Sequence, residues 1–145
     1  MEGGTALVYL DERTQTVQKV LKRKSKRTQA DANILREKEF HRIIRHVLGT
    51  DLSDTNVRVP KLYETASPFQ YKMGYIDTEI SVGPDHMRYP EVSHVIQEFM
   101  KRDIVLLDIE AYLQPNGTIM LLDFGQVYST HSSKETSCLA EAVKN

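Results

Sequence analysis

The chain has 145 residues, 40% of them hydrophobic, and a formal net charge of −1. This composition supports a single core and leaves no global field to recruit nucleic acid or a membrane surface. No stretch approaches the roughly 20 consecutive apolar residues of a membrane span, and no signal-peptide apolar region follows the first residues. Cys138 is the only cysteine, which excludes an internal disulfide and a cysteine-based zinc site. These features predict one intracellular domain, cytoplasmic or nuclear, that is not secreted and has no membrane partner.

Two β-favouring runs near the start, Thr5–Leu10 and Gln15–Leu21, predict a hairpin across a turn at Asp11–Thr14. Alternation along the second run places Val17 and Lys19 on the same face of the strand. Lys19 also opens a stretch to Arg27 in which six of nine residues are basic. A solvated turn is the preferred interpretation of that stretch, and a nucleic-acid-binding patch is a weaker alternative, because no aromatic residues interleave it.

The next predicted element is a helix from an N-cap at Asp31 to about Leu48, with Gly49 as its C-terminal stop. Its apolar residues follow the spacing of one helical stripe: Phe40, Ile43, Ile44, Val47 and Leu48. Glu37 lies three residues before Phe40, so its carboxylate is expected at the edge of the buried stripe. A carboxylate in that position needs a cationic partner.

Further strands are predicted at Val57–Glu64 and Phe69–Ile76, joined by a turn at 65–68. An irregular stretch at Thr78–Tyr89 follows. Pro90 then suits the first turn of a helix that runs to about Arg102.

The stretch Ile104–Val127 contains the strongest local signal in the chain, an Asn-Gly dipeptide at 116–117 between two apolar runs, which predicts a type I′ hairpin turn. The expected partners are Ile104–Leu107 and Thr118–Leu122. Asp108 and Asp123 would then emerge near the strand ends, where two carboxylates can converge on a metal-bound phosphate.

This stretch resembles the catalytic segment of the protein-kinase-like superfamily, which includes the eukaryotic protein kinases and the aminoglycoside and choline phosphotransferases. GTIMLLDFG at 117–125 matches the strand that delivers the metal-binding Asp of the Asp-Phe-Gly motif, and IVLLDI at 104–109 stands where the family has its catalytic loop. Leu106 and Leu107 occupy the family's His and Arg positions. Leu113 falls at the position of its metal-binding Asn, and the segment that carries this Asn looks deleted.

A rival alignment uses Lys101–Asp103 as the His-Arg-Asp motif, which would make Asp103 catalytic and put Asp108 in place of the Asn. Asp108 is preferred as the catalytic residue, since the apolar pair Ile104-Val105 belongs before the catalytic Asp.

The resemblance extends to the first half of the chain. TVQKVL at 16–21 is similar to the family strand with the phosphate-binding Lys, for which Lys22 is the fallback, and YKMGYID at 71–77 is similar to the strand that ends in the adenine-binding hinge. The resemblance implies ATP and Mg²⁺ as cofactors. It assigns nucleotide contacts to Val17, Lys19, Met73 and Tyr75, the ion-pair partner of Lys19 to Glu37, the general base to Asp108 and the Mg²⁺ ligand to Asp123.

The fold class that follows is α+β and protein-kinase-like: an antiparallel N-lobe sheet of about five strands with one long helix (about 1–77) and a much reduced C-lobe (about 78–145). Gly3-Gly4 resembles the remains of a glycine-rich loop, residues 128–133 take the place of an activation loop, and a short helix is predicted at 135–144. The resemblance covers only about the first half of the family domain, so the domain is expected to be truncated.

Three functions remain open at this point. The first is a minimal kinase-like phosphotransferase that binds ATP and Mg²⁺. The second is a pseudokinase that acts as a regulatory or protein-binding module, with a partner that completes or uses the truncated lobe. The weaker third is a basic-patch nucleic-acid binder.

Overall fold

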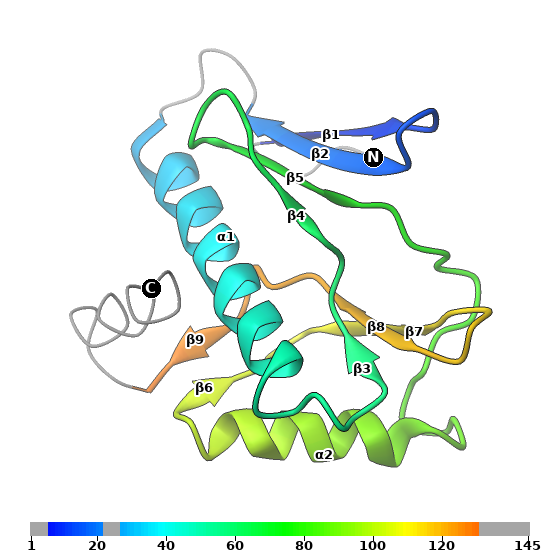
Figure 1. Ribbon diagram of the computed structural model, residues 1–145. Coiled ribbons are helices and arrows are strands. Elements are labelled where there is room, and N and C mark those ends of the chain that lie inside the picture. Colours follow the sequence, from blue (N-terminus) through cyan, green and yellow to red (C-terminus); the bar gives the residue numbers. More distant parts are fainter. Residues whose placement is uncertain (1–5, 22–26, 131–145) are drawn as a thin grey trace.

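The computed structural model describes residues 6–21 and 27–130, which fold as a mixed α+β protein (Figure 1). An antiparallel sheet lies at one end, a long helix runs from it towards the other end, and a second lobe with a shorter helix and smaller sheets lies there. The predictions for Gly3-Gly4, Lys22, residues 131–133 and the helix at 135–144 lie outside the described residues. No helix among the described residues is long and apolar enough to span a bilayer.

The N-lobe sheet has the strand order β1-β2-β5-β4, with every pair antiparallel. Its strands are β1 (Ala6–Asp11), β2 (Thr16–Leu21), β4 (Leu62–Tyr63) and β5 (Gln70–Gly74). The two predicted hairpins, β1-β2 and β4-β5, are both confirmed. Within the described residues this sheet contains four strands, not the five expected.

The strand predicted at Val57–Glu64 is instead two strands that belong to different sheets. Its first part, β3 (Val57–Arg58), pairs in parallel with a strand of the second lobe, and its last part is β4. Pro60 lies between them and has no N–H for a ladder hydrogen bond. Its carbonyl oxygen accepts a hydrogen bond from His41 instead. The chain therefore passes from the second sheet to the N-lobe sheet at this proline.

Helix α1 (Arg27–Gly49) connects the two lobes. It ends close to the predicted position, but Gly49 is its last helical residue and has no positive φ, so the predicted left-handed stop at Gly49 is wrong. The helix begins before Asp31, so this residue lies inside it and is not its N-cap. The residues Arg27, Gln29 and Ala30 are good helix formers, which explains the extra turn. The predicted apolar stripe is buried, with relative exposures of 0% for Ile43 and Ile44.

The second lobe contains helix α2 (Tyr89–Met100) and four short strands, β6 (Ile104–Val105), β7 (Glu110–Leu113), β8 (Ile119–Leu122) and β9 (Tyr128–Ser129). Strands β7 and β8 form a three-stranded sheet with β3, in the order β3-β8-β7, and β6 and β9 form a two-stranded sheet. Pro90 lies in the first turn of α2 as predicted. The core of this lobe includes Phe40, Ile43, Ile44, Leu48, Val57, Val95, Phe99, Ile104, Leu121 and Phe124.

The predicted pairing of Ile104–Leu107 with Thr118–Leu122 is wrong. Strand β8 pairs with β7, which the sequence pattern did not indicate, and β6 pairs with β9. The weak signal from β7 has a physical cause, because its first residues, Glu110 and Ala111, are poor strand formers. The Asn-Gly dipeptide does form the hairpin turn, but only Gly117 has a positive φ there, at 89°. A type I′ turn needs positive φ at both residues, so this is a different turn.

Candidate functional site

The ion pair predicted between Lys19 and Glu37 is present. Lys19 Nζ lies 3.0 Å and 3.3 Å from the two carboxylate oxygens of Glu37. Glu37 is only 7% exposed, on the edge of the buried stripe of α1. Lys19 lies directly opposite Tyr71 on β5, and its Nζ is 5.8 Å from the centroid of that ring. The ion pair holds the Lys19 ammonium group in place, and 28% of the Lys19 side chain remains exposed.

Two predicted nucleotide contacts share the face of the sheet that carries Lys19. Val17 lies directly opposite Met73 across β2 and β5, just as Lys19 lies opposite Tyr71. Alternate residues of a strand, and residues directly opposite each other, point to the same face. Tyr75 comes just after the end of β5 and is exposed, and its backbone N–H donates to the carbonyl oxygen of Gln15. The role of these side chains in nucleotide binding stays a prediction.

The structure brings Asp108 and Asp123 to the same end of a hairpin, although not through the predicted pairing. Glu110 at the start of β7 lies opposite Leu122 at the end of β8. Asp108 lies two positions before β7 and Asp123 directly follows β8, so both lie at the same end of the β7-β8 hairpin. Their φ angles are 55° and 70°. Positive φ costs energy for a residue other than glycine, although Asp tolerates it better than most, and such residues cluster at functional sites.

The carboxylate of Asp123 has a negative neighbour that the family pattern does not include. Burial, followed by the negative charge of Glu110, raises the pKa of Asp123 above its usual range, while the Gly125 backbone and Lys19 act in the opposite direction. The hydroxyl of Tyr112 donates to Glu110 Oε1 at 2.5 Å, and this bond raises the pKa of Tyr112 to about 12. Asp123, Glu110 and Lys19 therefore interact electrostatically within one site.

The rival assignment of Asp103 stays a prediction, and Asp103 also has a positive φ, of 62°. Asp103 lies between α2 and β6, and its carbonyl oxygen accepts a hydrogen bond from the Thr130 N–H. Thr130 is seven residues beyond Asp123, past the end of β9. Leu113, at the family's Asn position, is half-buried against the core and offers no ligand. The family's Asn position is therefore apolar, and Glu110 is the acidic residue beside Asp123.

Two further contacts attach the segment after Asp123 to helix α1, and the sequence pattern did not single them out. The Arg36 guanidinium donates to the carbonyl oxygen of Gly125 at 2.6 Å. The ring of Phe124 is fully buried and meets the ring of His41 edge-on, with centroids 5.3 Å apart. The position of both residues relative to Glu37 could have indicated these contacts. Arg36 is the residue before Glu37, and His41 lies one helical turn after Glu37.

His41 has a hydrogen-bond partner on each of its ring nitrogens. Its Nε2 lies 2.7 Å from the Pro60 carbonyl oxygen and its Nδ1 lies 2.5 Å from the Tyr71 hydroxyl. A carbonyl can only accept, so Nε2 carries the hydrogen and Tyr71 donates to Nδ1. Burial lowers the pKa of His41 to about 4 and raises that of Tyr71 well above its ordinary value. The pair is therefore neutral and fully hydrogen-bonded beside Phe124.

The donor set of this site fits Mg²⁺, the metal that the kinase resemblance implies. Asp123 and Glu110 supply carboxylate oxygens, and Mg²⁺ is commonly held by one or two carboxylates together with substrate phosphates and water. Among residues 6–21 and 27–130, no group of three or more His, Cys, Asp or Glu side chains is arranged to hold a metal ion.

No protein-family model matches the sequence, and no curated protein matches it. Solved structures do match. The Rio2 kinase of Chaetomium thermophilum, in a complex with ADP/Mg²⁺-phosphoaspartate, has a TM-score of 0.50 and 17% identity over 99% of this chain and 52% of its own. Another structure of that kinase has a TM-score of 0.51 and 16% identity over 99% of this chain and 55% of its own. This chain thus spans about half the length of the kinases it matches, and its fold is protein-kinase-like, with an antiparallel N-lobe sheet, a long helix and a second lobe.

Proposed function

We propose that this chain binds ATP with Mg²⁺ at the site formed by Lys19, Glu37 and Asp123. The observation that carries the proposal is the Lys19–Glu37 ion pair of 3.0 Å on the face that also carries Val17 and Met73. A phosphoryl-transfer site needs a fixed cation for the phosphates and a carboxylate for the metal. The matching Rio2 kinase was solved with ADP and Mg²⁺, which supports the same ligand class here.

Glu110 is our candidate for the second metal ligand. In protein kinases the Asp of the Asp-Phe-Gly motif and a catalytic-loop Asn hold the metal ions. Leu113 packs against the core at the expected Asn position, whereas the charge of Glu110 reaches Asp123. Two neighbouring carboxylates repel each other, and a divalent cation between them would relieve that repulsion. Metal binding would then lower the raised pKa of Asp123.

Phosphoryl transfer by this chain is proposed to be weak or absent, with Asp108 as the general base if it occurs. Asp108 is exposed, and the two residues before it are leucines, one of them buried. Neither leucine can donate a hydrogen bond to position the carboxylate or the transferred group. The favoured alternative to a minimal phosphotransferase is therefore a nucleotide-binding pseudokinase that acts through a protein partner.

The test of nucleotide binding is a thermal-shift measurement on the 145-residue protein with millimolar Mg-ATP. A ligand at about 100 times its dissociation constant adds about 2.7 kcal/mol to the free energy of unfolding, which raises the melting temperature. Lys19→Met should abolish the shift. Lys72→Met is the matched control, because Lys72 is on the opposite face of the same sheet. If wild-type protein shows no shift with or without Mg²⁺, nucleotide binding is refuted.

Substitutions at the three acidic residues distinguish the proposed metal ligands, Asp123 and Glu110, from the proposed general base, Asp108. Asp123→Asn and Glu110→Gln should each reduce the Mg²⁺-dependent part of the shift, as EDTA does. Asp108→Asn should leave it unchanged, because a general base acts on the nucleophile and not on the bound nucleotide. Robust ATP turnover by wild-type protein that Asp108→Asn removes would identify a phosphotransferase and end the pseudokinase alternative.

A further inference from the structure

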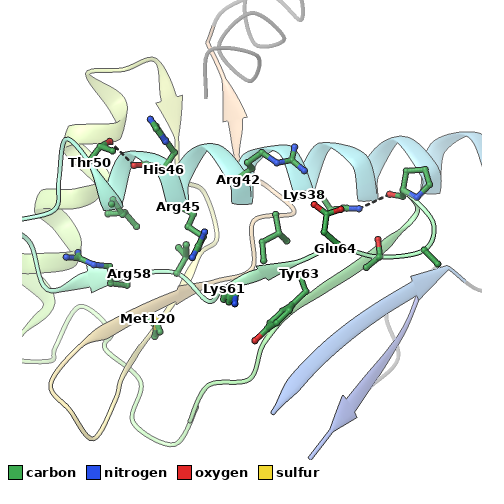
Figure 2. Close-up of a pocket in the computed structure, with 17 residues that line it drawn as sticks. Lys38, Arg42, Arg45, His46, Thr50, Arg58, Lys61, Tyr63, Glu64 and Met120 are labelled. Carbon is green, nitrogen blue, oxygen red and sulfur yellow. Dashed lines mark hydrogen bonds between the residues drawn. The ribbon is translucent and has the colours of Figure 1, made fainter. Parts of the chain in front are cut away.

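A groove with a cavity volume of about 1010 Å³ lies between helix α1 and the segment that runs from β3 past β4 (Figure 2). On the helix it is lined by Lys38, Arg42 and Arg45, which follow the i, i+4, i+7 spacing of a single stripe. That stripe extends about 10 Å along the helix axis. The centre of this stripe lies roughly a quarter of a turn around α1 from the centre of the Glu37–His41 pair. The lining of the groove does not include Lys19, Glu37 or Asp123, so the groove is separate from the proposed nucleotide site.

The lining of the groove is strongly basic. One acidic residue, Glu64, stands against five lysines and arginines and one histidine: Lys38, Arg42, Arg45, Arg58, Lys61 and His46. They come from both walls, the helix on one side and the β3-to-β4 segment on the other (Figure 2). This gathering is local, since the whole chain has a net charge of −1. Positive potential concentrated in a concave surface attracts anionic ligands.

The cations of the groove differ in how far they are already engaged. Arg58 donates to the backbone carbonyls of Ser53, Thr55 and Val57, and Arg42 forms an ion pair with Glu39. Lys38 donates to the Pro68 carbonyl, and its pKa is lowered by burial and then by the positive charge of Arg42.

Arg45 and Lys61, by contrast, are exposed, and they line opposite walls. A carboxylate that bridged the walls would therefore meet these two side chains first. The electrostatic attraction of this carboxylate would be stronger because Arg42 and Lys38 add to the same positive potential.

The floor of the groove is apolar. Leu48 and Val59 are buried there with relative exposures of 0% and 6%, and Leu62 and Met120 also line the cavity. A cationic rim over an apolar floor suits a ligand with both acidic and apolar groups. Strand β4 adds a backbone element, because it is the last strand of its sheet and its residues line the groove. Extended peptides bind along such edge strands.

Nucleic acid fits this surface less well. Proteins that bind single strands combine cations with aromatic rings on which bases stack. Tyr63 is the aromatic residue of this lining, and two ammonium groups lie over its ring, with Lys61 Nζ 5.1 Å and Lys72 Nζ 5.8 Å from the centroid. A ring already engaged with two lysines is a poor stacking platform for a base.

We propose that this groove binds an acidic peptide segment of a partner protein, with carboxylates on Arg45 and Lys61 and an apolar side chain against the half-buried Leu62 and Met120. This role is independent of nucleotide binding. The occupant would contact the two walls together, so both the helix and the β4 segment contribute to the binding energy.

The test is fluorescence anisotropy on the full chain with a labelled peptide of three Glu-Glu-Leu repeats, at about physiological ionic strength. The double variant Arg45→Glu with Lys61→Glu should weaken binding by at least about tenfold, the effect of losing roughly 1.4 kcal/mol. Arg13→Glu with Lys101→Glu is the matched control, since it makes the same charge change at exposed positions outside the groove. The control should bind as wild type does.

Three outcomes would overturn the proposal. The first is no peptide binding by wild-type protein whose fold is verified by circular dichroism. The second is an equal loss in the control variant, which would show non-specific attraction. The third is tighter binding of an oligothymidylate than of the peptide, which would assign the groove to nucleic acid. A Glu-Glu-Ser peptide should bind more weakly than the Glu-Glu-Leu peptide, and equal affinity would show that the apolar floor is not used.

Discussion

Helix α1 carries two stripes of polar side chains that differ in burial and in how their polar groups are paired. On the core-facing stripe, Glu37 and His41 are buried, and each has hydrogen-bond partners outside the helix. On the groove-facing stripe, Arg42 is half-exposed and Arg45 is exposed, and the nearest acidic partner is the helix neighbour Glu39. Buried polar groups must be paired because desolvation is costly, whereas exposed ions remain solvated and available. The first stripe therefore holds the fold and the second is suited to a ligand.

The largest expected effect comes from removing the ring that the core-facing stripe contacts. Phe124→Ala should lower the free energy of unfolding by about 3–5 kcal/mol, the usual cost of truncating a fully buried aromatic side chain. Urea denaturation measures this loss. Tyr128→Ala, at a residue with 44% exposure, is the control and should change stability by less than about 0.5 kcal/mol. Similar losses in the two variants would contradict the central place assigned to Phe124.

The neutral state of His41 predicts a pH dependence of stability. Burial holds its folded-state pKa at about 4, while the unfolded chain titrates near about 6.5. Between these values the unfolded state binds the proton and the folded state does not, so stability is full above about pH 6.5 and falls as the pH drops towards about 4. The expected loss from this group is about 3 kcal/mol.

The measurement is urea denaturation of wild type and His41→Gln from about pH 7.5 to about pH 4.5. Other groups titrate in both proteins, so only the difference between the two curves reports on His41. The wild-type curve should fall more steeply. Parallel curves would show that His41 does not carry the effect.

A smaller effect is expected from the Tyr71 hydroxyl. Tyr71→Phe removes the donor to His41 Nδ1 and leaves a buried acceptor unsatisfied, which should cost about 1–3 kcal/mol. Thermal or urea denaturation reports the change. Tyr75→Phe removes a hydroxyl from an exposed ring and should be neutral. If Tyr71→Phe is also neutral, the hydrogen bond between Tyr71 and His41 contributes nothing to stability.

The smallest expected effect is on the groove-facing stripe. Arg45→Glu should change the free energy of unfolding by no more than about 0.5 kcal/mol, because the residue is exposed. The same denaturation assay measures it. A loss near that of Tyr71→Phe would remove the contrast between the stripes and make Arg45 a structural residue.

The sequence by itself determined the features that depend on local periodicity. Strand alternation placed Val17 and Lys19 on one face, and the helical stripe placed Glu37 at the buried edge. The choice of Lys19 as the partner of Glu37 came from the kinase resemblance and not from these local patterns. The hairpins β1-β2 and β4-β5 followed from short turns between alternating runs. The resemblance in the Asp-Phe-Gly stretch was enough to indicate the fold.

Tertiary structure alone decided which distant segments pair. The partners of β6 and β8, the transfer of β3 to the second sheet and the approach of Glu110 to Asp123 all depend on contacts between residues that local patterns do not relate. A short run such as Ile104–Val105 can pair with any neighbouring edge, and the closing of the core around Phe124 selects one. The basic groove arises in the same way, because its two walls are separate segments whose charges gather only when β3 and β4 pack beside α1.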